Sequence, residues 1–209
     1  MTERLGVLVE DETDCATIKE LVRRLLAPAT HIGIHGRSGF GCSSLRRKAG
    51  SWIRELTARG CTGFILVHDL DRDPQSNALN DERRLRQALS IHTESCNAHL
   101  ICIPIEEIEA WFWSDPALVR KIGRGQGRDA RQPHNIQQPK EALIRLSRDA
   151  GGRPLYSQND NPKLASALDL DLCARRCPAF AELRAFVLAF SARAAPPKPK
   201  THRRVTKRT

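Results

Sequence analysis

The sequence predicts an α/β protein with a mostly parallel four-stranded sheet, flanked by helices and followed by a C-terminal helical appendage. Short apolar segments alternate with amphipathic ones through residues 1–122, a pattern typical of parallel strands joined by crossover helices. The segment Phe64–Val67 is apolar at every position, as expected for a strand covered on both faces. Acidic residues follow three of the predicted strands. In open α/β sheets, that carboxyl edge is where ligands bind.

The predicted elements alternate along the chain from the first strand. The strands are expected at residues 5–9, 30–34, 64–67 and 99–103. The first helix has the apolar spacing i, i+3, i+4, i+7, i+8 from Ile18, is capped by Thr13 or a neighbouring Asp, and ends at Pro28. The second has Leu45, Ala49, Trp52, Ile53 and Leu56 on one face and stops at Gly60, the third spans residues 82–91, and a fourth begins near Glu106.

The chain divides into three regions by composition. Residues 1–122 form the α/β domain. Residues 123–194 begin with a polar, glycine-rich loop and continue as helices near 140–150, 161–168 and 179–194, so we expect them to form a helical appendage packed on the core. Residues 195–209 carry six Lys or Arg and no acid, which predicts a disordered basic tail. Such a tail either binds nucleic acid phosphates or only increases solubility.

Composition excludes several classes of protein. The chain is 40% hydrophobic and 28% charged, and no apolar run approaches the roughly 20 residues of a membrane span. The amino terminus lacks the pattern of a signal peptide. Seven scattered cysteines predict reduced thiols and a cytoplasmic location. Cys173 and Cys177 have no second Cys or His pair nearby, so a zinc site is not expected.

The acids at the three strand ends predict a magnesium or manganese site. In a parallel sheet these ends lie along the same edge, and hard carboxylate oxygens suit Mg²⁺ or Mn²⁺. Glu106 and Glu109 are expected on one helix face, turned towards the strand ends. The candidate metal ligands are Glu10, Asp14, Asp69, Asp71, Glu106 and Glu109.

Basic residues near these acids are candidates for holding a polyanion. A glycine-rich segment, residues 35–48, could bring backbone amides close to a phosphate, although its spacing matches neither a P-loop nor a dinucleotide fingerprint. The candidate nucleic-acid-binding residues outside the appendage are Arg37, Arg46, Arg47, Lys48, Arg203 and Arg204.

Two motifs resemble the Toprim domain of topoisomerases, primases and OLD-type nucleases. They are VEDETD, which begins one residue before Glu10, and HDLDRD, which contains Asp69 and Asp71. An IEAWFW segment at 108–113 and a lysine-containing, CPAF-bearing segment at 161–180 are similar to compact stand-alone Toprim-like proteins, often encoded beside ABC-type ATPases in phage-defence loci. Asp11 stands where the family usually has glycine. Aspartate tolerates left-handed backbone, but its charge could alter metal binding.

The resemblance implies a Toprim-like, Rossmann-like fold and a Mg²⁺-dependent nuclease. Glu10 would be the general base or a metal ligand, Asp69 and Asp71 the Mg²⁺ ligands, and Glu109 a further ligand. These four are the expected catalytic residues. Lys163 would contact a phosphate or lie free on the surface. DNA or RNA is the expected substrate, with an ABC-type ATPase as a possible partner.

Other functions remain open from the sequence. Tyr156 is the only tyrosine and lies in the appendage, and no zinc module is present, which disfavours topoisomerase and primase activity. A receiver domain of two-component signalling would accept a phosphoryl group on Asp69 and hold Mg²⁺ with Glu10 and Asp11. It also needs a Ser or Thr after the fourth strand and a Lys after a fifth, which the sequence does not offer. A non-catalytic adaptor for an ATPase is the third possibility.

Overall fold

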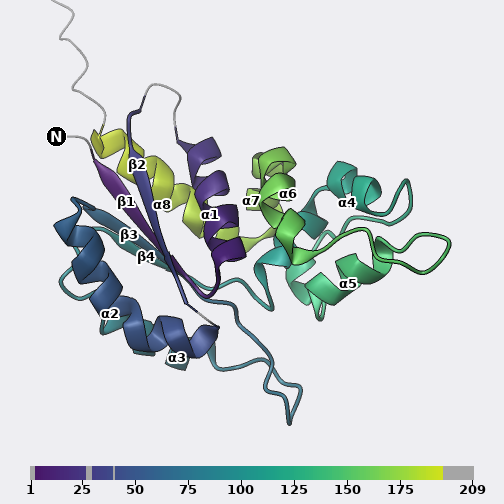
Figure 1. Cartoon of the computed structure of the whole chain (residues 1–209), viewed down its shortest axis with the longest axis horizontal. Helices are drawn as coiled ribbons and strands as arrows, with labels where there is room; N and C mark the ends of the chain where they lie inside the picture. Colours follow the sequence, from purple (N-terminus) through teal and green to yellow (C-terminus); the bar gives the residue numbers. More distant parts are fainter. Residues whose placement is uncertain (1–2, 27–29, 40, 195–209) are drawn as a thin grey trace, which may run out of the picture.

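The protein is built on a four-stranded sheet in which every pair of neighbouring strands is parallel. The computed structural model describes residues 3–26, 30–39 and 41–194. The strands are β1 (Arg4–Val9), β2 (Gly33–Ser38), β3 (Gly63–Val67) and β4 (His99–Cys102). Their order across the sheet is β2-β1-β3-β4 (Figure 1). The predicted α/β class with a parallel four-stranded sheet is confirmed.

Helices cover both faces of the sheet because its central strands are apolar on both sides. All five residues of β3 are buried. One face packs against α1 (Glu12–Leu25) and α8 (Pro178–Ala194), and the other against α2 (Cys42–Ala58) and α3 (Glu82–Ser90) (Figure 1). The first three helices lie close to their predicted positions. The last predicted helix, α8, returns to the sheet and is part of its cover.

The second strand was predicted too early in the chain. It was expected at residues 30–34 but runs from Gly33 to Ser38, paired with β1 from Arg4↔Gly33 to Val9↔Ser38. As an edge strand it is only partly buried and has few apolar residues, so its sequence lacks the apolar run of the central strands. Residues 35–38, predicted as part of a glycine-rich loop, therefore belong to the sheet.

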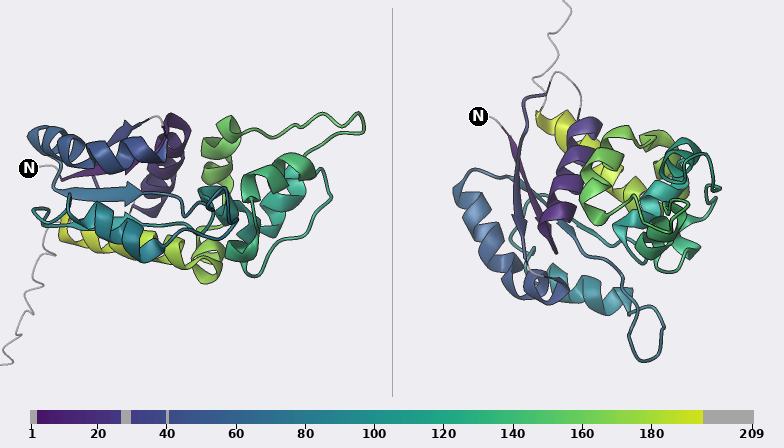
Figure 2. Two further views of the ribbon diagram at one scale, coloured as in Figure 1. Left: turned by 90° about the horizontal axis from the view of Figure 1, so that it is seen from below. Right: turned by 45° about the vertical axis from the view of Figure 1, so that its right-hand side comes forward.

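The helices between β4 and α8 lie beyond the carboxyl ends of the strands. In Figure 2 (left) the strand arrow points towards this green part of the chain. Its elements are the 3₁₀ helices η1 (Ile108–Ser114), η2 (Pro133–Asn135) and η3 (Gln158–Asp160), and the α-helices α4 (Pro116–Ile122), α5 (Pro139–Leu146), α6 (Asn161–Ala167) and α7 (Leu170–Arg176). Helices were predicted at α5, α6 and α8, but not at α4 or α7. Because α6 packs against α1, the C-terminal helical appendage adjoins the acidic edge of the sheet.

Three further observations concern features expected from the sequence. No helix within the described ranges has both the length and the apolar content needed to cross a membrane. The cysteines whose side chains are described, Cys173 and Cys177 among them, are free thiols, and these two are buried in the core. Pro28 and the basic tail, residues 195–209, lie outside the described residues.

Gly63, the first residue of β3, has no room for a side chain. A Cβ atom there would lie 2.5 Å from Cε2 of Phe190 on α8 and 3.0 Å from Cδ2 of Leu5. We expect Gly63→Ala to lower the free energy of unfolding by about 1–3 kcal/mol, the usual cost of overpacking, measured by urea unfolding. The control Gly151→Ala adds a Cβ whose nearest neighbour, a carboxylate oxygen of Asp149, is 3.4 Å away. An equal loss in both variants would contradict this packing argument.

Candidate active site at the carboxyl edge of the sheet

Glu10 and Asp69 meet where the two central strands end. Glu10 follows β1 directly, and Asp69 comes two residues after the end of the neighbouring strand β3. The backbone N–H of Asp69 donates a hydrogen bond to Oε1 of Glu10 at 3.1 Å. The ring nitrogen Nδ1 of His68 lies 2.8 Å from the same oxygen. The parallel register of β1 and β3 therefore fixes the Glu10 carboxylate beside the DxD segment, as the sequence predicted.

His68 belongs to this site, although its sequence gave no chemical signal beyond its place before Asp69. It is 5% exposed. Nδ1 lies 2.8 Å from both Oε1 of Glu10 and the backbone oxygen of Asp69. Both are acceptors, so Nδ1 carries a proton. The other nitrogen, Nε2, is buried and has no hydrogen-bond partner among the described residues. A buried polar atom without a partner is uncommon and points to a ligand or water.

The start of α1 adds a buried carboxylate, that of Asp14. Asp11 is the N-cap, and its Oδ1 accepts the backbone N–H of Asp14 at 2.9 Å. Its Oδ2 accepts Nε2 of Gln158, from η3 in the appendage, at 2.9 Å. Asp14 is 7% exposed. Burial, followed by the charges of Asp11, Glu109 and Glu10, raises the pKa of Asp14 to about 8. The Asp14 carboxylate is thus close enough to those of Glu109 and Glu10 to be repelled by them.

Glu109 enters the site from η1 and is oriented by the appendage. It is 2% exposed, and burial raises the pKa of its carboxyl group. Nδ2 of Asn161, at the start of α6, donates to its Oε1 at 2.9 Å. The hydroxyl of Tyr156 donates to Oδ1 of Asn161 at 2.7 Å. This chain of hydrogen bonds fixes which end of the Asn161 amide faces Glu109. Neither Asn161 nor Tyr156 was predicted to have this role.

Asp69 and Asp71 complete a group that we call the acidic cluster. Its members are Glu10, Asp14, Asp69, Asp71 and Glu109. The pKa of Asp69 is raised well above its usual value. Burial is the largest cause, followed by the negative charges of Asp14, Glu10, Glu109 and Asp71. The pKa of Asp71 is raised to about 6, first by burial and then by the negative charge of Glu10. The cluster therefore concentrates more negative charge than its surroundings neutralise.

The acidic cluster is not preassembled as a metal-ligand shell. No three or more His, Cys, Asp or Glu side chains in the described part of the chain are arranged to hold a metal ion. The donors themselves are hard carboxylate oxygens, which Mg²⁺ and Mn²⁺ prefer. The chemistry of the donor set therefore fits such an ion, and the side chains would have to turn towards it. A divalent cation would also relieve the repulsion that raises their pKa values.

Glu106, predicted to share a helix face with Glu109, does not lie in a helix. Its backbone has φ of 65°, and the 3₁₀ helix begins only at Ile108. Its carboxylate pairs with Arg72, with Oε1 2.7 Å from Nε and 2.6 Å from Nη2. Glu106 and Glu109 therefore point to different partners. The prediction of a shared face was wrong because the left-handed residue breaks the helical spacing on which it depended.

Lys140, on α5, is a positive charge beside the cluster that the sequence did not reveal. Its Nζ lies 3.1 Å from Oε1 of Glu107. Burial lowers the pKa of Lys140, but the Glu107 carboxylate more than offsets this and the pKa is raised. The positive charge of Lys140 in turn lowers the pKa values of Asp14, Asp71 and Glu109. Lys140 therefore offsets part of the negative charge of the cluster.

The basic residues predicted to bind nucleic acid are distributed differently around the site. Arg37 lies on β2, and its guanidinium is held by Glu55. Arg46 lines a cleft beside the acidic cluster, whereas Nε of Arg47 donates to the backbone oxygen of Ser43 at 3.2 Å. Lys48 is exposed on α2. Arg46 is thus the member of this basic segment that the structure brings to the acids.

The remaining predicted nucleic-acid-binding residues lie away from this cleft or cannot be placed. Lys163 is exposed on α6, in a separate pocket of about 170 Å³ that it shares with Lys121 and Arg124. Arg203 and Arg204 lie outside the described residues.

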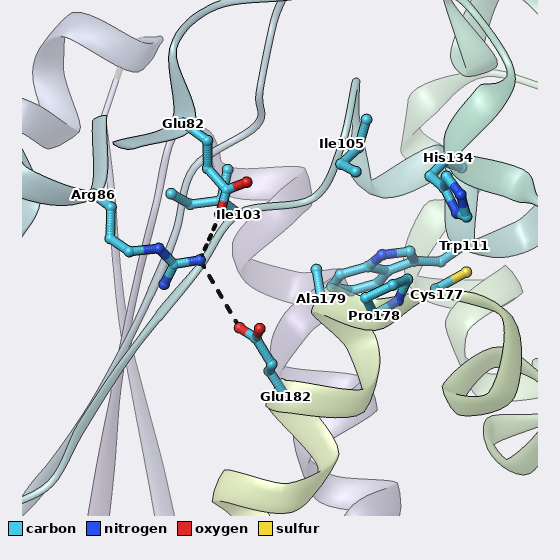
Figure 3. A pocket seen from close by; sticks show the side chains of 11 residues that line it. Glu82, Arg86, Ile103, Ile105, Trp111, His134, Cys177, Pro178, Ala179 and Glu182 are labelled. Atoms are coloured by element: carbon cyan, nitrogen blue, oxygen red, sulfur yellow. Dashed lines mark hydrogen bonds and ion pairs between the residues drawn. The ribbon is translucent and has the colours of Figure 1, made fainter. Parts of the chain in front are cut away.

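Two hollows near the sheet edge differ in their suitability for a phosphate. The cleft beside the cluster holds about 450 Å³ and is lined by Asp69, Asp71, Arg46 and Arg84, among others. A second pocket holds about 120 Å³ beside Trp111. There Nη2 of Arg86 lies 2.8 Å from Glu82 and 4.0 Å from Glu182 (Figure 3). Because Arg86 is already neutralised in the smaller pocket, the larger cleft is the better candidate for binding substrate.

The fold and the site define a class of protein: a parallel α/β protein with buried carboxylates gathered at the carboxyl edge of its sheet. The chain belongs to the family described as a domain of unknown function, DUF4276, whose model matches residues 9–187. That match includes all members of the acidic cluster, as well as Asn161 from the appendage. No curated protein and no solved structure matches the chain.

Proposed function

We propose that this protein is a Mg²⁺- or Mn²⁺-dependent nuclease that hydrolyses phosphodiester bonds in DNA or RNA. The observation that carries the proposal is the acidic cluster, in which five carboxyl groups from four segments of the chain meet. Burial raises the pKa values of four of them, and repulsion from other members of the cluster adds to this for Asp14, Asp69 and Asp71. The Toprim resemblance at Glu10, Asp69 and Asp71 supports the same chemistry.

Each member of the site has a role in the proposal. Glu10, Asp14, Asp69, Asp71 and Glu109 would hold the ion. When bound, the ion would activate water and neutralise charge developing on the phosphoryl group. His68 keeps Glu10 in place through Nδ1, while its free Nε2 could accept a hydrogen bond from a water at the site. Lys140 contributes a fixed positive charge beside Asp71. Glu106 is left out, since Arg72 occupies its carboxylate.

The alternatives have less support. A receiver domain needs a hydroxyl residue after β4 and a lysine after a fifth strand. Here Ile103, Pro104 and Ile105 follow β4, and the described residues form a four-stranded sheet. Lys140 is near the acids, but it comes from a helix. A non-catalytic adaptor would have no need for repelling buried acids. From the resemblance, the proposal also includes a role in phage defence with an ABC-type ATPase as partner.

The direct test is cleavage of single- and double-stranded DNA and RNA with Mg²⁺, Mn²⁺ or EDTA. We expect cleavage with either metal ion and none with EDTA. Asp71→Asn should reduce the rate at least about ten-fold, because loss of one charged ligand costs more than about 1.4 kcal/mol in the transition state. Asp73→Asn is the matched control, because Asp73 is partly buried like Asp71 but accepts hydrogen bonds from Gln75 and Ser76 instead.

Three outcomes of this test separate the functions. Equal activity of Asp71→Asn and wild type would contradict the metal-ligand assignment. No cleavage by the wild type, alone or with its ATPase partner, would refute the nuclease proposal. Labelling of wild type but not Asp69→Asn by acetyl phosphate would support the receiver reading in its place.

A further inference from the structure

The cleft beside the acidic cluster is lined by charges of both signs. Asp69 and Asp71 line it just after the end of β3, and Asp81 lines it from the N-cap of α3. Arg46, from the second turn of α2, and Arg84, from the first turn of α3, also line it. These two helices cover the same face of the sheet (Figure 1). The core packing of α2 and α3 therefore brings two arginines from distant segments to a cleft that contains both DxD carboxylates.

Neither arginine is neutralised by a strong ion pair. Nε of Arg84 lies 3.5 Å from Oδ2 of Asp81, but the Arg84 side chain is 87% exposed, and an exposed pair of this kind contributes little. Arg46 is exposed and forms no ion pair with any described residue; its backbone oxygen contacts His92. Arg37, by contrast, is held by Glu55. The two cleft arginines therefore keep their donors for another partner.

Two further features favour an anionic ligand at or next to this cleft. The N-cap of α2, Gly41, donates its backbone N–H to the backbone oxygen of Glu10 at 3.2 Å, so the positive end of this 17-residue helix lies at the acidic edge. The first turn of α2 contains no acid to satisfy that end. His68 lines the cleft too, is 5% exposed, and has no partner for Nε2.

We propose that this cleft holds the backbone of a single nucleic acid strand, with Arg46 and Arg84 binding its phosphates opposite Asp69 and Asp71. The proposal rests on the nuclease function and specifies its substrate and the path of the strand. A volume of about 450 Å³ lies within the range of pockets that enclose a small ligand. It accommodates about one nucleotide of one backbone, whereas a duplex presents two backbones. Arginine suits the task because its planar donors match phosphate oxygens.

The chain supplies a matched control for each arginine. Arg47 is adjacent to Arg46 and Arg83 to Arg84, and neither neighbour lines the cleft. All four side chains are exposed, so alanine at any of them should leave the melting temperature unchanged. The comparison of each pair keeps the net charge, the helix and the local field nearly constant.

The experiment is equilibrium binding of a fluorescein-labelled single strand, of DNA and of RNA, measured by anisotropy with Ca²⁺ in place of Mg²⁺. We expect Arg46→Ala and Arg84→Ala each to raise Kd about ten-fold, the loss of a charged hydrogen bond. Each should also make the slope of log K against log salt less steep by about 0.7, as for one phosphate contact on a single strand. Arg47→Ala and Arg83→Ala should change Kd less than about two-fold.

The result can separate this proposal from the nuclease function. If the cleft variants lose affinity but the wild type never cleaves with Mg²⁺, the strand path stands and the nuclease function fails. If the wild type cleaves but the cleft variants bind like their neighbours, the strand path is refuted and the nuclease function stands. Tighter binding of an unlabelled duplex than of the single strand, in competition, would refute the choice of substrate.

Discussion

Replacing Asp69 with asparagine is expected to slow cleavage strongly and, at the same time, to stabilise the metal-free protein. The Asp69 carboxylate is surrounded by the other four acids of the cluster. Burial is the largest cause of its raised pKa, and the negative charges of these neighbours raise it further: Asp14, Glu10, Glu109 and Asp71. Loss of a metal ligand at this position should slow cleavage about 10³-fold, equal to several kcal/mol of transition-state stabilisation. The amide keeps the shape of the side chain but removes a charge that the folded state disfavours.

The stability effect follows from the sign of the pKa shift. An acid whose pKa is higher in the folded state than in the unfolded chain binds protons more tightly when folded, so its ionisation favours unfolding as pH rises. At pH 8 without metal, Asp69→Asn should therefore raise the melting temperature by several degrees, about 2–4 °C per kcal/mol for a chain of this size. The gain should shrink towards pH 4, where the wild-type carboxyl is protonated.

Differential scanning calorimetry with EDTA and with Mg²⁺ tests both parts. Mg²⁺ should raise the melting temperature of the wild type, because a ligand that binds only the folded state stabilises it, and should have little effect on Asp69→Asn. Asp73→Asn should show no gain, because hydrogen bonds from Ser76 and Gln75 lower the pKa of Asp73. A melting temperature lower than wild type in EDTA at pH 8 would contradict the repulsion assigned to Asp69.

The sequence predicted the central strands because burial on both faces leaves a continuous apolar run. The two central strands, β1 and β3, fall within one residue of their expected bounds. The edge strand β2 was displaced because all six of its residues are only partly buried and it contains no apolar run. The short helix α4 was missed although Asp115 and Pro116 form a recognisable N-cap and first position, with Asp115 accepting the N–H groups of Ala117 and Leu118.

The candidate site was predictable only where the strand-end rule applies. Glu10 and Asp69 are 59 positions apart, yet both follow neighbouring parallel strands, so topology alone brings them together. Asn161 meets Glu109 across 52 positions, and Gln158 meets Asp11 across 147. These contacts depend on how the appendage packs at the sheet edge, which no spacing in the sequence encodes. The appendage therefore supplies hydrogen bonds to two acidic segments of the site.

Among residues that hold the acidic cluster in place, Asn161 is the one whose replacement is expected to lower stability most, in the variant Asn161→Leu. Leucine has the same number of side-chain heavy atoms and the same branch point as asparagine, so the variant removes the hydrogen bonds and keeps a branched side chain. Asn161 is 0% exposed and joins the Tyr156 hydroxyl to Glu109. Without it, a buried carboxylate and a buried hydroxyl both lose a partner. We expect a loss of about 3 kcal/mol in the free energy of unfolding, and therefore a fall of roughly 6–12 °C in melting temperature.

A double-mutant cycle with Glu109→Leu shows whether the Glu109 carboxylate causes the loss of stability in Asn161→Leu. If most of the loss comes from leaving the Glu109 charge buried without its donor, Asn161→Leu should cost much less when Glu109 is already leucine, with a coupling of at least about 1 kcal/mol. Tyr156→Phe, which removes only the hydroxyl donor, should cost about 1 kcal/mol. Additive losses in the cycle would mean that Asn161 stabilises α6 alone and does not orient Glu109. In that case the appendage would be a neighbour of the acidic cluster and not part of it.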